Sequence, residues 1–431
     1  MANFNWMPNE ILELIFENLD FRTRRNLSLV CRRWNNVLLS ERFIERRVLL
    51  AIDGNRPLNV KHLVLERRYP NVKLQFDSRC SNETFKALRV LLPVCVPAPT
   101  FLCLHTQWND PRWTALCEDQ LLNLRTVAVL HLIGSCKADP RGPMALQMDE
   151  LRTLKLEVID VDGLSLLMAP KLSNLSVWVQ SERHVELLRQ FVTQLHTLHI
   201  VFNAKESFSF YRLDLSNLRR LAIDRRLKGM TKSEQNASIS FFRRLVHLRE
   251  LELIVKFIDS YVLHTMFEKL TQLEQLSLQV SEGTIELVHI AKLTRLKRLR
   301  VGASRINLQQ AALPALRTLV LGSPELETGT YLEGIECLMA FTRLHSLSLV
   351  NVKIYPEVLQ LTPTYAVERM LLSNYRRLEE THLLIFVKRF PALRWLRISH
   401  CHGVHQREID KMKRTLPRLA VAFDEAKSDR V

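Results

Sequence analysis

The chain has 431 residues, and its 61 Lys and Arg against 45 Asp and Glu give a formal net charge of +16. Hydrophobic residues make up 47% and charged residues 25%, a composition that is typical of folded proteins and excludes a mainly disordered chain. Glycine is scarce, with 11 residues, which disfavours folds that need many glycines in phosphate-binding loops and hairpin turns. At roughly 150 residues per domain the length predicts about two or three domains. The positive charge raises the question of a nucleic-acid or membrane partner.

No segment of the sequence predicts secretion or membrane insertion. The first residues lack the basic region and the continuous apolar core of a secretory signal. The most apolar stretch, residues 90–104, is interrupted by Pro93, Pro97 and Pro99 and falls short of the ~20 apolar residues that cross a bilayer. The eight cysteines are sparse and show no paired spacing, which favours reduced thiols. We therefore expect a protein of the cytoplasm, the nucleus or both, without a membrane partner.

A helical pattern occupies the start of the chain. Pro8 suits the first turn of a helix, where its missing N–H costs nothing, and Glu10 complements the positive end of the helix dipole. An apolar stripe at helical spacing follows, formed by Ile11, Leu12, Ile15, Phe16 and Leu19. A second short helix is predicted to contain Leu27, Leu29 and Val30, with Cys31 and Trp34 continuing its apolar side. So short a segment with so much apolar surface makes a poor core by itself, which predicts a partner that covers it.

These positions resemble the F-box motif over about residues 4 to 47, including the terminal Cys31-x-x-Trp34, although Met7 stands where the family more often has Leu. The resemblance implies binding to a Skp adaptor and, through it, to a cullin–RING scaffold and its ubiquitin-conjugating partner. The residues that it implies for adaptor binding are Pro8, Ile11, Leu12, Ile15, Phe16, Leu19, Leu27, Val30, Cys31 and Trp34. Replacing Ile15 and Phe16 by Asp is expected to abolish that binding.

From residue 151 onward one phrase, L-x-x-L-x-L, recurs eleven times at spacings of 20 to 30 residues. Its first positions are Leu151, Leu172, Leu195, Leu218, Leu248, Leu273, Leu296, Leu316, Leu344, Val367 and Leu393. Alternate side chains of a strand share a face, so the fourth and sixth positions point inward together, and stacked parallel strands bury a row that one unit cannot bury alone. The rest of each period returns as a helix or an irregular segment, and residues 262–270 have helical apolar spacing.

This phrase resembles the leucine-rich repeat, whose units are about 20–29 residues long. The resemblance implies an α/β fold in which an all-α F-box precedes a solenoid with a parallel concave sheet and a helical or irregular convex side. We expect an F-box at 1–48, a linker with degenerate early repeats at 49–150, the solenoid at 151–423 and a polar tail at 424–431. Within 49–150 the apolar spacing predicts strands near residues 60–65, 102–104 and 127–132.

The sequence contains no motif that predicts catalysis. Phosphate-binding loops, dinucleotide-binding glycine motifs, zinc-protease motifs and nucleophile elbows are all missing. No cysteine stands out as a nucleophile, since Cys31 belongs to the F-box pattern and Cys103 to an apolar run. The cluster His400-Cys401-His402 with His405 could imitate a metal site, but it fits a repeat turn better. We expect a non-catalytic subunit without a cofactor or a metal.

Substrate recognition is therefore expected on the repeats, where the third, fifth and seventh positions of each unit point to the concave face. The candidate residues are Trp178, His199, Arg298, Arg300, Arg369, Trp395 and Arg397. Arg298 and Arg300 lie in a run, residues 292–305, with six basic residues and no acidic one. Paired guanidiniums suit a phosphorylated or acidic peptide. The alternative interpretation of these residues is a solvated surface with scattered charges.

The sequence thus predicts the substrate-recognition subunit of a Skp–cullin–F-box ubiquitin ligase. A leucine-rich-repeat scaffold that binds proteins without causing their degradation is the alternative. A nucleic-acid-binding protein is a weaker one, because most of the excess positive charge lies outside the concave positions of the repeats.

Overall fold

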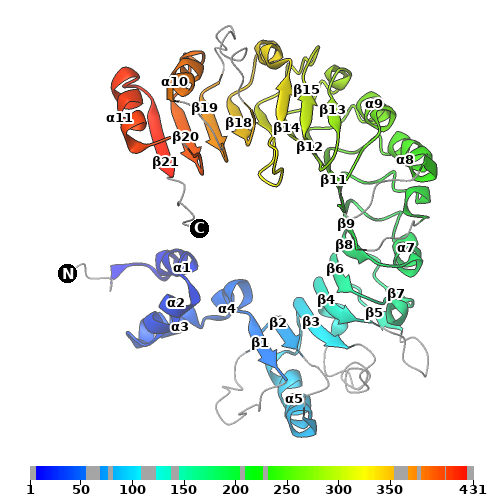
Figure 1. The fold of residues 1–431 in the computed structure, drawn as a ribbon. Helices are drawn as coiled ribbons and strands as arrows, with labels where there is room; N and C mark the ends of the chain where they lie inside the picture. The colour runs from blue at the N-terminus through cyan, green and yellow to red at the C-terminus, as the bar shows by residue number, and fades with distance from the viewer. Residues whose placement is uncertain are drawn as a thin grey trace. The chain divides into compact units, whose positions relative to one another are not determined.

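The computed structural model describes residues 6–54, 68–75, 81–107, 123–136, 145–203, 209–226, 232–353, 367–375, 380–402 and 404–424. The predicted strand at residues 60–65 lies outside them. The chain divides into a first compact unit, residues 1–178 and 186–194, and a second, residues 179–185 and 195–431 (Figure 1).

The first unit begins with four short helices, α1 (Asn9–Glu17), α2 (Phe21–Ser28), α3 (Arg32–Leu38) and α4 (Glu41–Arg47). Three of them start at a residue whose side chain caps the helix: Asp20 accepts from the N–H of Thr23, and Cys31 and Ser40 make the same kind of contact three residues ahead. The predicted second helix is therefore two helices. The extended backbone of Cys31 separates them, because it serves as the N-cap of α3.

Of the sixteen longer parallel strands among the described residues, six belong to the first unit, together with one longer helix. The elements are β1 (Leu50–Asp53), β2 (Asn71–Gln75), α5 (Asn82–Cys95), β3 (Phe101–Gln107), β4 (Val129–Ser135), β6 (Thr153–Val158) and β8 (Asn174–Val179), with the short pair β5 (Leu146–Gln147) and β7 (Leu167–Met168). The strands predicted near 102–104 and 127–132 are confirmed as β3 and β4. The strands β1 and β2 were not predicted, because their apolar residues do not complete the repeat phrase.

The second unit holds the other ten long strands in sequence order. They are β9 (Thr197–Phe202), β10 (Arg220–Arg225), β11 (Glu250–Val255), β12 (Gln275–Val280), β14 (Arg298–Gly302), β16 (Thr318–Leu321), β18 (Ser346–Val350), β19 (Arg369–Ser373), β20 (Trp395–Ser399) and β21 (Ala420–Asp424). Every one of the eleven predicted phrases contributes a strand, in β6, β8, β9 and onward to β20, so the predicted fold class is confirmed. The strand β21 was missed, although Leu416, Leu419 and Val421 repeat the same spacing.

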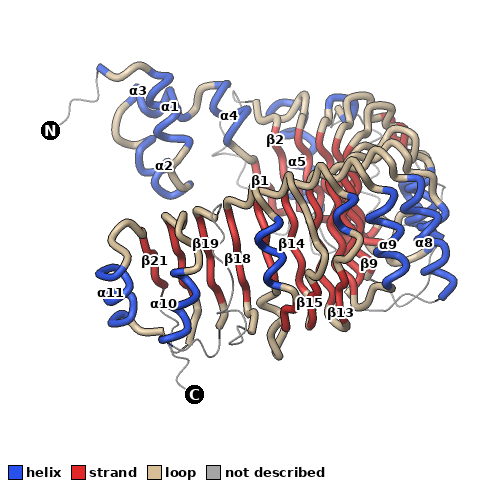
Figure 2. The backbone as a smooth tube through the Cα atoms, turned by 90° about the horizontal axis from the view of Figure 1, so that it is seen from above, coloured by secondary structure: helices blue, strands red, loops and turns tan. Residues whose placement is uncertain are grey.

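In both units, helices and short segments connect the strands and cover one side of them (Figure 2). The α-helices are α7 (Glu182–Arg189), α8 (Lys232–Arg244), α9 (Ser260–Lys269), α10 (Glu380–Lys388) and α11 (Gln406–Thr415). A small parallel sheet consists of β13 (Thr284–Glu286), β15 (Arg305–Asn307) and β17 (Tyr331–Glu333). Short 3-10 helices lie at Leu124–Thr126, Asp162–Leu164, Ser209–Arg212, Ile290–Lys292 and Ile335–Ala340. The helical spacing predicted for residues 262–270 is confirmed as α9, whose Val262, Met266 and Phe267 are buried.

The core of the second unit is built from in-register rows of apolar side chains. One such row consists of Leu221, Leu251, Leu276, Leu299, Leu319, Leu347, Met370 and Leu396. All of its members are buried. The side chains that alternate with them point to the other face, which the helices leave open (Figure 1).

One buried ion pair lies inside this core. Arg225 at the end of β10 and Glu234 on α8 are each only 5% exposed, and their side chains are 2.7 Å apart. The Arg225 guanidinium also lies 5.5 Å from the centre of the Phe202 ring. The adjacent Tyr211 is fully buried, and this burial raises its pKa to about 12 although the charge of Arg225 opposes the shift. The core tolerates these two buried charges because each one neutralises the opposite charge of the other at close range.

The turns that leave four successive strands share a left-handed backbone. Gly322, Asn351, Asn374 and His400 directly follow β16, β18, β19 and β20, and all four have positive φ. Asparagine tolerates this conformation better than most residues. The Asn351 amide also donates to the carbonyl oxygen of Leu326 at 2.5 Å. Gly322 is the most constrained of the four, because a Cβ there would lie 2.0 Å from the Val350 carbonyl oxygen.

Gly322→Ala is expected to lower the free energy of unfolding by at least about 2 kcal/mol, since it combines an unfavourable φ with a backbone clash. Urea unfolding followed by circular dichroism measures this loss. Gly283→Ala is the matched control: its φ is also positive, at 108°, but the nearest atom to a new Cβ is 3.6 Å away on the Phe257 ring. Equal losses in both variants would contradict the role of the clash.

Candidate functional site

The first helix divides the apolar F-box residues between two faces. Leu12 and Phe16 are buried and form a core with Val37, Leu38 and Phe43. Ile11, Leu14 and Ile15 are exposed on another face, because successive residues of a helix turn by about 100°. The amphipathic stripe that the sequence indicates is therefore split by the fold into an inner and an outer half.

The remaining face of α1 contacts α4 through ion pairs. Glu17 pairs with Arg47 at 3.1 Å and Glu13 with Arg42 at 3.6 Å. At the start of α1, Arg33 of α3 donates to the Asn9 side-chain oxygen at 3.0 Å. Two faces of α1 are therefore covered by contacts within the helical module: the apolar face that contains Leu12 and the acidic face that contains Glu13 and Glu17. These contacts leave the side formed by Ile11, Leu14 and Ile15 to solvent.

The Cys31-x-x-Trp34 spacing has a structural cause. The Cys31 sulfur accepts a hydrogen bond from the Trp34 backbone N–H at 3.4 Å, as an N-cap does for the third residue of its helix. The cap fixes the start of α3, and the Trp34 ring then meets Phe16 edge-on, with ring centres 5.5 Å apart. The motif therefore sets the angle between α1 and α3 as well as the apolar composition.

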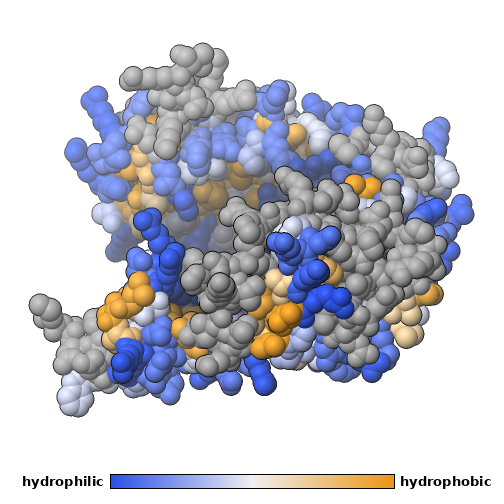
Figure 3. Space-filling view, turned by 90° about the horizontal axis from the view of Figure 1, so that it is seen from below, coloured by the Kyte–Doolittle hydropathy of each residue, from blue (hydrophilic) through white to orange (hydrophobic). Residues whose placement is uncertain are grey.

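Large apolar side chains are concentrated on the surface of this module. Leu29 is 81% exposed and Ile15 is 39% exposed, and the other members are Trp6, Ile11, Leu14 and Val30. Cys31 is exposed as well. We call these seven residues the F-box apolar surface. The space-filling view shows several apolar patches among hydrophilic residues on the visible face (Figure 3). Exposed apolar residues concentrated in so small a module are typical of a protein-interaction site.

The structure separates the ten residues predicted for adaptor binding into two groups. Pro8, Ile11, Ile15, Val30 and Cys31 are exposed. Leu12 and Phe16 are buried, and Leu19, Leu27 and Trp34 pack partly buried against the same core. The sequence reading missed Trp6, Leu14 and Leu29, which the motif does not single out. It also treated Ile15 and Phe16 as equivalent, whereas replacing Phe16 by Asp would place a charge in the core.

A groove lies on the open face of the second unit. It has a volume of about 550 Å³ and is lined by residues of β9, β10, β11, β12, β14 and β16. Three predicted substrate residues, His199, Arg298 and Arg300, line it. Arg369 and Trp395 line a second hollow of about 480 Å³ together with Glu368 and Arg394. The predicted residues of the second unit are therefore divided between at least two hollows, while Trp178 is half-buried in the first unit.

Several basic side chains of residues 292–305 already form ion pairs within the chain and are therefore less available to a ligand than the sequence suggests. Lys297 lies 2.6 Å from Glu274, and this contact lowers the pKa of the glutamate. Lys292 pairs with Glu268 at 3.6 Å, and Arg305 with Glu333 at 3.7 Å. Among the described residues, Arg298 and Arg300 have no acidic partner. Arg295 donates to the neutral Gln272 side chain at 2.5 Å, and the cations of this run that line the groove are Arg298 and Arg300.

One arrangement on the first unit imitates a catalytic triad. The Cys103 sulfur lies 3.7 Å from His131 Nδ1, and His131 Nε2 lies 3.3 Å from a Glu157 carboxylate oxygen. Burial raises the pKa of the Cys103 thiol and, with the charge of Lys155, lowers the pKa of His131. Both shifts favour the neutral thiol and the neutral imidazole, so this geometry does not supply an activated nucleophile.

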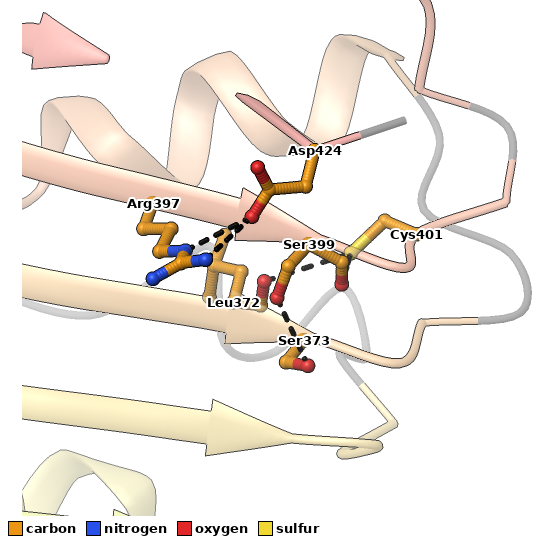
Figure 4. Close-up of polar contacts among 6 residues, drawn as sticks. All are labelled: Leu372, Ser373, Arg397, Ser399, Cys401 and Asp424. Atoms are coloured by element: carbon orange, nitrogen blue, oxygen red, sulfur yellow. Dashed lines mark hydrogen bonds and ion pairs between the residues drawn. The ribbon is translucent and has the colours of Figure 1, made fainter. Parts of the chain in front are cut away.

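The predicted repeat turn around Cys401 is a buried structural contact. The Cys401 thiol lies 3.3 Å from the Ser399 carbonyl oxygen and 3.7 Å from that of Leu372 (Figure 4). On the neighbouring surface, Arg397 donates to Asp424 at 2.8 Å, so this predicted substrate residue is already paired within the chain. Within the described parts of the chain, no group of three His, Cys, Asp or Glu side chains is placed to hold a metal ion.

The comparisons with known proteins concern both parts of the chain. Residues 4–46 match the F-box domain family. No curated protein sequence matches the chain. An internalin from Listeria monocytogenes is 14% identical, with 97% of this chain and 95% of that chain covered and a TM-score of 0.42. A leucine-rich-repeat protein from Leptospira interrogans is 16% identical, with 81% of this chain and 89% of that chain covered and a TM-score of 0.40.

Among the described helices, none has both the length and the apolarity that a membrane span requires. The family match covers all seven residues of the F-box apolar surface, and the strands that follow carry the recurring leucine phrase. The chain therefore contains an F-box domain at residues 4–46, followed by parallel strands with the pattern of leucine-rich repeats.

Proposed function

We propose that this protein is the substrate-recognition subunit of a Skp–cullin–F-box ubiquitin ligase. The F-box binds the Skp adaptor, the adaptor connects the chain to a cullin–RING scaffold, and the repeats bind a protein substrate. The observation that carries this proposal is the F-box apolar surface. It occurs within the residues that match the F-box family, and the module's own packing leaves it exposed.

Physical reasoning supports a tight adaptor complex. The apolar side chains of α1 lie on a helix whose other faces are fixed by the core and by α4, so little side-chain or backbone order is lost on binding. Apolar anchors presented by a rigid element are the residues that dominate binding energy at protein interfaces. The repeats favour a protein client, because their open face offers polar and charged side chains along many strands.

Alkylation of Cys31 tests the adaptor contact directly. Because Cys31 is exposed next to Val30, we expect a bound Skp adaptor to slow its reaction with iodoacetamide by at least about tenfold. Peptide mapping by mass spectrometry measures the rate for each cysteine. Cys337, which is partly exposed in the second unit, is the internal control and should react at the same rate with and without the adaptor. Unchanged reactivity of Cys31 in a complex that demonstrably forms would contradict this contact surface.

A scaffold that binds proteins without degrading them remains the alternative function. Both functions predict adaptor binding, so a different measurement separates them. Reconstitution with the adaptor, cullin, RING protein and ubiquitin-conjugating enzyme should transfer ubiquitin to a bound client if the chain is a ligase receptor. Client binding without ubiquitin transfer would favour the scaffold.

A further inference from the structure

The groove of the second unit carries opposite charges on two strands that are not neighbours. The register places Glu250, Gln275 and Arg298 in one row across β11, β12 and β14. The next row, two residues further along each strand, contains Glu252, Ser277 and Arg300. All six residues line the groove. An acidic strand and a basic strand therefore face the same hollow, with a strand of uncharged polar residues between them.

On the acidic side, Glu252 is the available carboxylate. Glu250 pairs with Arg220 of β10, with nitrogen and oxygen 2.7 Å apart. Glu252 is exposed and has no cationic partner among the residues that the structure describes. In its row it stands between Ala222 and Ser277, and these two small side chains leave the space around the carboxylate open.

On the basic side, Arg300 is oriented by a neutral group. The Gln279 amide, with its oxygen turned toward Arg300, accepts from the guanidinium at 3.2 and 3.3 Å. Arg298 is exposed in the row alongside. The next strand offers Thr318 and Val320 at the matching positions, neither of which carries a charge. Both guanidiniums are thus free to bind an anion in the groove.

Among the described residues no ion pair joins these opposite charges, whose strands are separated by β12. Adjacent strands lie about 4.8 Å apart, so the backbones of β11 and β14 are separated by about 9.6 Å across β12. A segment with only acidic side chains would bind Arg298 and Arg300 but would also face Glu250 and Glu252. A segment with only basic side chains would bind Glu252 but would also face Arg298 and Arg300. Like charges held close together are unfavourable, so the groove selects against both.

We infer that this groove binds an extended peptide segment that carries one basic and one acidic side chain about three residues apart. The basic side chain pairs with Glu252 and the acidic one with Arg298 and Arg300. A polyproline II segment fits best, because its rise of about 3.1 Å and its three residues per turn place residues i and i+3 on one side about 9.3 Å apart. In a β-strand, same-face residues are about 6.6 or 13 Å apart instead. This inference names the substrate class and rests on the proposed function of the repeats.

Selection from a random peptide library displayed on phage tests the inference with the full chain. We expect the enriched peptides to contain a basic and an acidic residue at a separation of about three. Binding of a selected peptide should fall at least about fivefold in Glu252→Gln and in Arg298→Gln/Arg300→Gln. Arg243→Gln/Glu336→Gln, which changes two exposed residues outside the groove lining, is the matched control.

Three outcomes would overturn the inference: enriched peptides with acidic residues alone, equal binding by the charge variants and the wild-type chain, or no enrichment at all. Each variant is also tested for Skp adaptor binding and for its melting temperature. Normal adaptor binding with no selection of bipolar peptides would remove the inference and leave the proposed function standing. Bipolar selection by a chain that does not bind the adaptor would remove the ligase assignment instead.

Discussion

Ile15→Asp is expected to weaken binding of the Skp adaptor by about 30- to 1000-fold, which corresponds to about 2–4 kcal/mol at an interface anchor. The side chain is 39% exposed in the free protein, so a carboxylate there can stay hydrated and the helices keep their fold. In the complex the same carboxylate would be desolvated against an apolar partner. Leu29→Asp should behave in the same way. Isothermal titration with purified adaptor measures both affinities.

The controls separate loss of contact from loss of fold. Ile159 is also in the first unit and is 59% exposed, but it lies outside the F-box, so Ile159→Asp should bind the adaptor normally. Phe16→Ala should remove about 3–5 kcal/mol of stability by opening a cavity next to Trp34, and its loss of binding would reflect unfolding. If Ile15→Asp bound within threefold of the wild-type affinity while remaining folded, the F-box apolar surface would not be the adaptor site.

Glu234→Ala is expected to lower the free energy of unfolding of the second unit by about 3–5 kcal/mol. Its partner Arg225 is 5% exposed and would be left as a buried charge without a counter-ion. The nearby Phe202 ring stabilises the guanidinium but does not neutralise it. Denaturant unfolding followed by tryptophan fluorescence measures the loss.

Two comparisons make this second prediction specific to a buried pair. The exposed pair Lys256–Glu282 has a similar nitrogen–oxygen distance of 3.1 Å, and Glu282→Ala should cost less than about 1 kcal/mol. The double variant Arg225→Met/Glu234→Leu should be more stable than Glu234→Ala, because it removes both charges together. A double variant that is no better than the single one would mean that packing around α8, rather than the unpaired charge, determines the loss.

The groove of the second unit shows how the structure changes the ligand that is expected from the charge of the sequence alone. The sequence indicates a basic run at residues 292–305, whose paired guanidiniums suit a phosphorylated or acidic peptide. Ion pairs with Glu268, Glu274 and Glu333 then occupy three of its cations. Of the other three, Arg298 and Arg300 share a groove with Glu252, which the sequence places 46 residues before Arg298. Only parallel strand pairing brings the two charges together.

The sequence by itself determined the apolar stripe of the first helix and the eleven strands of the recurring phrase, because each depends on local spacing. Three- and four-residue intervals place side chains on one helix face, and the phrase L-x-x-L-x-L places leucines on one strand face. These intervals persist in any packing arrangement. The strand β21 follows the same rule and could have been found, whereas β1 and β2 depart from it.

Only the tertiary structure decided which residues are available for binding. Leu12 and Ile15 belong to one apolar stripe, yet one fills the core with Phe16 and the other remains exposed, because α3 and α4 cover only part of α1. Arg397 and Arg300 occupy equivalent positions in their repeats, yet Arg397 is paired with Asp424 of the next strand. Burial and ion pairing depend on which neighbours the fold brings close. That information is distributed over distant parts of the chain, where local spacing does not reveal it.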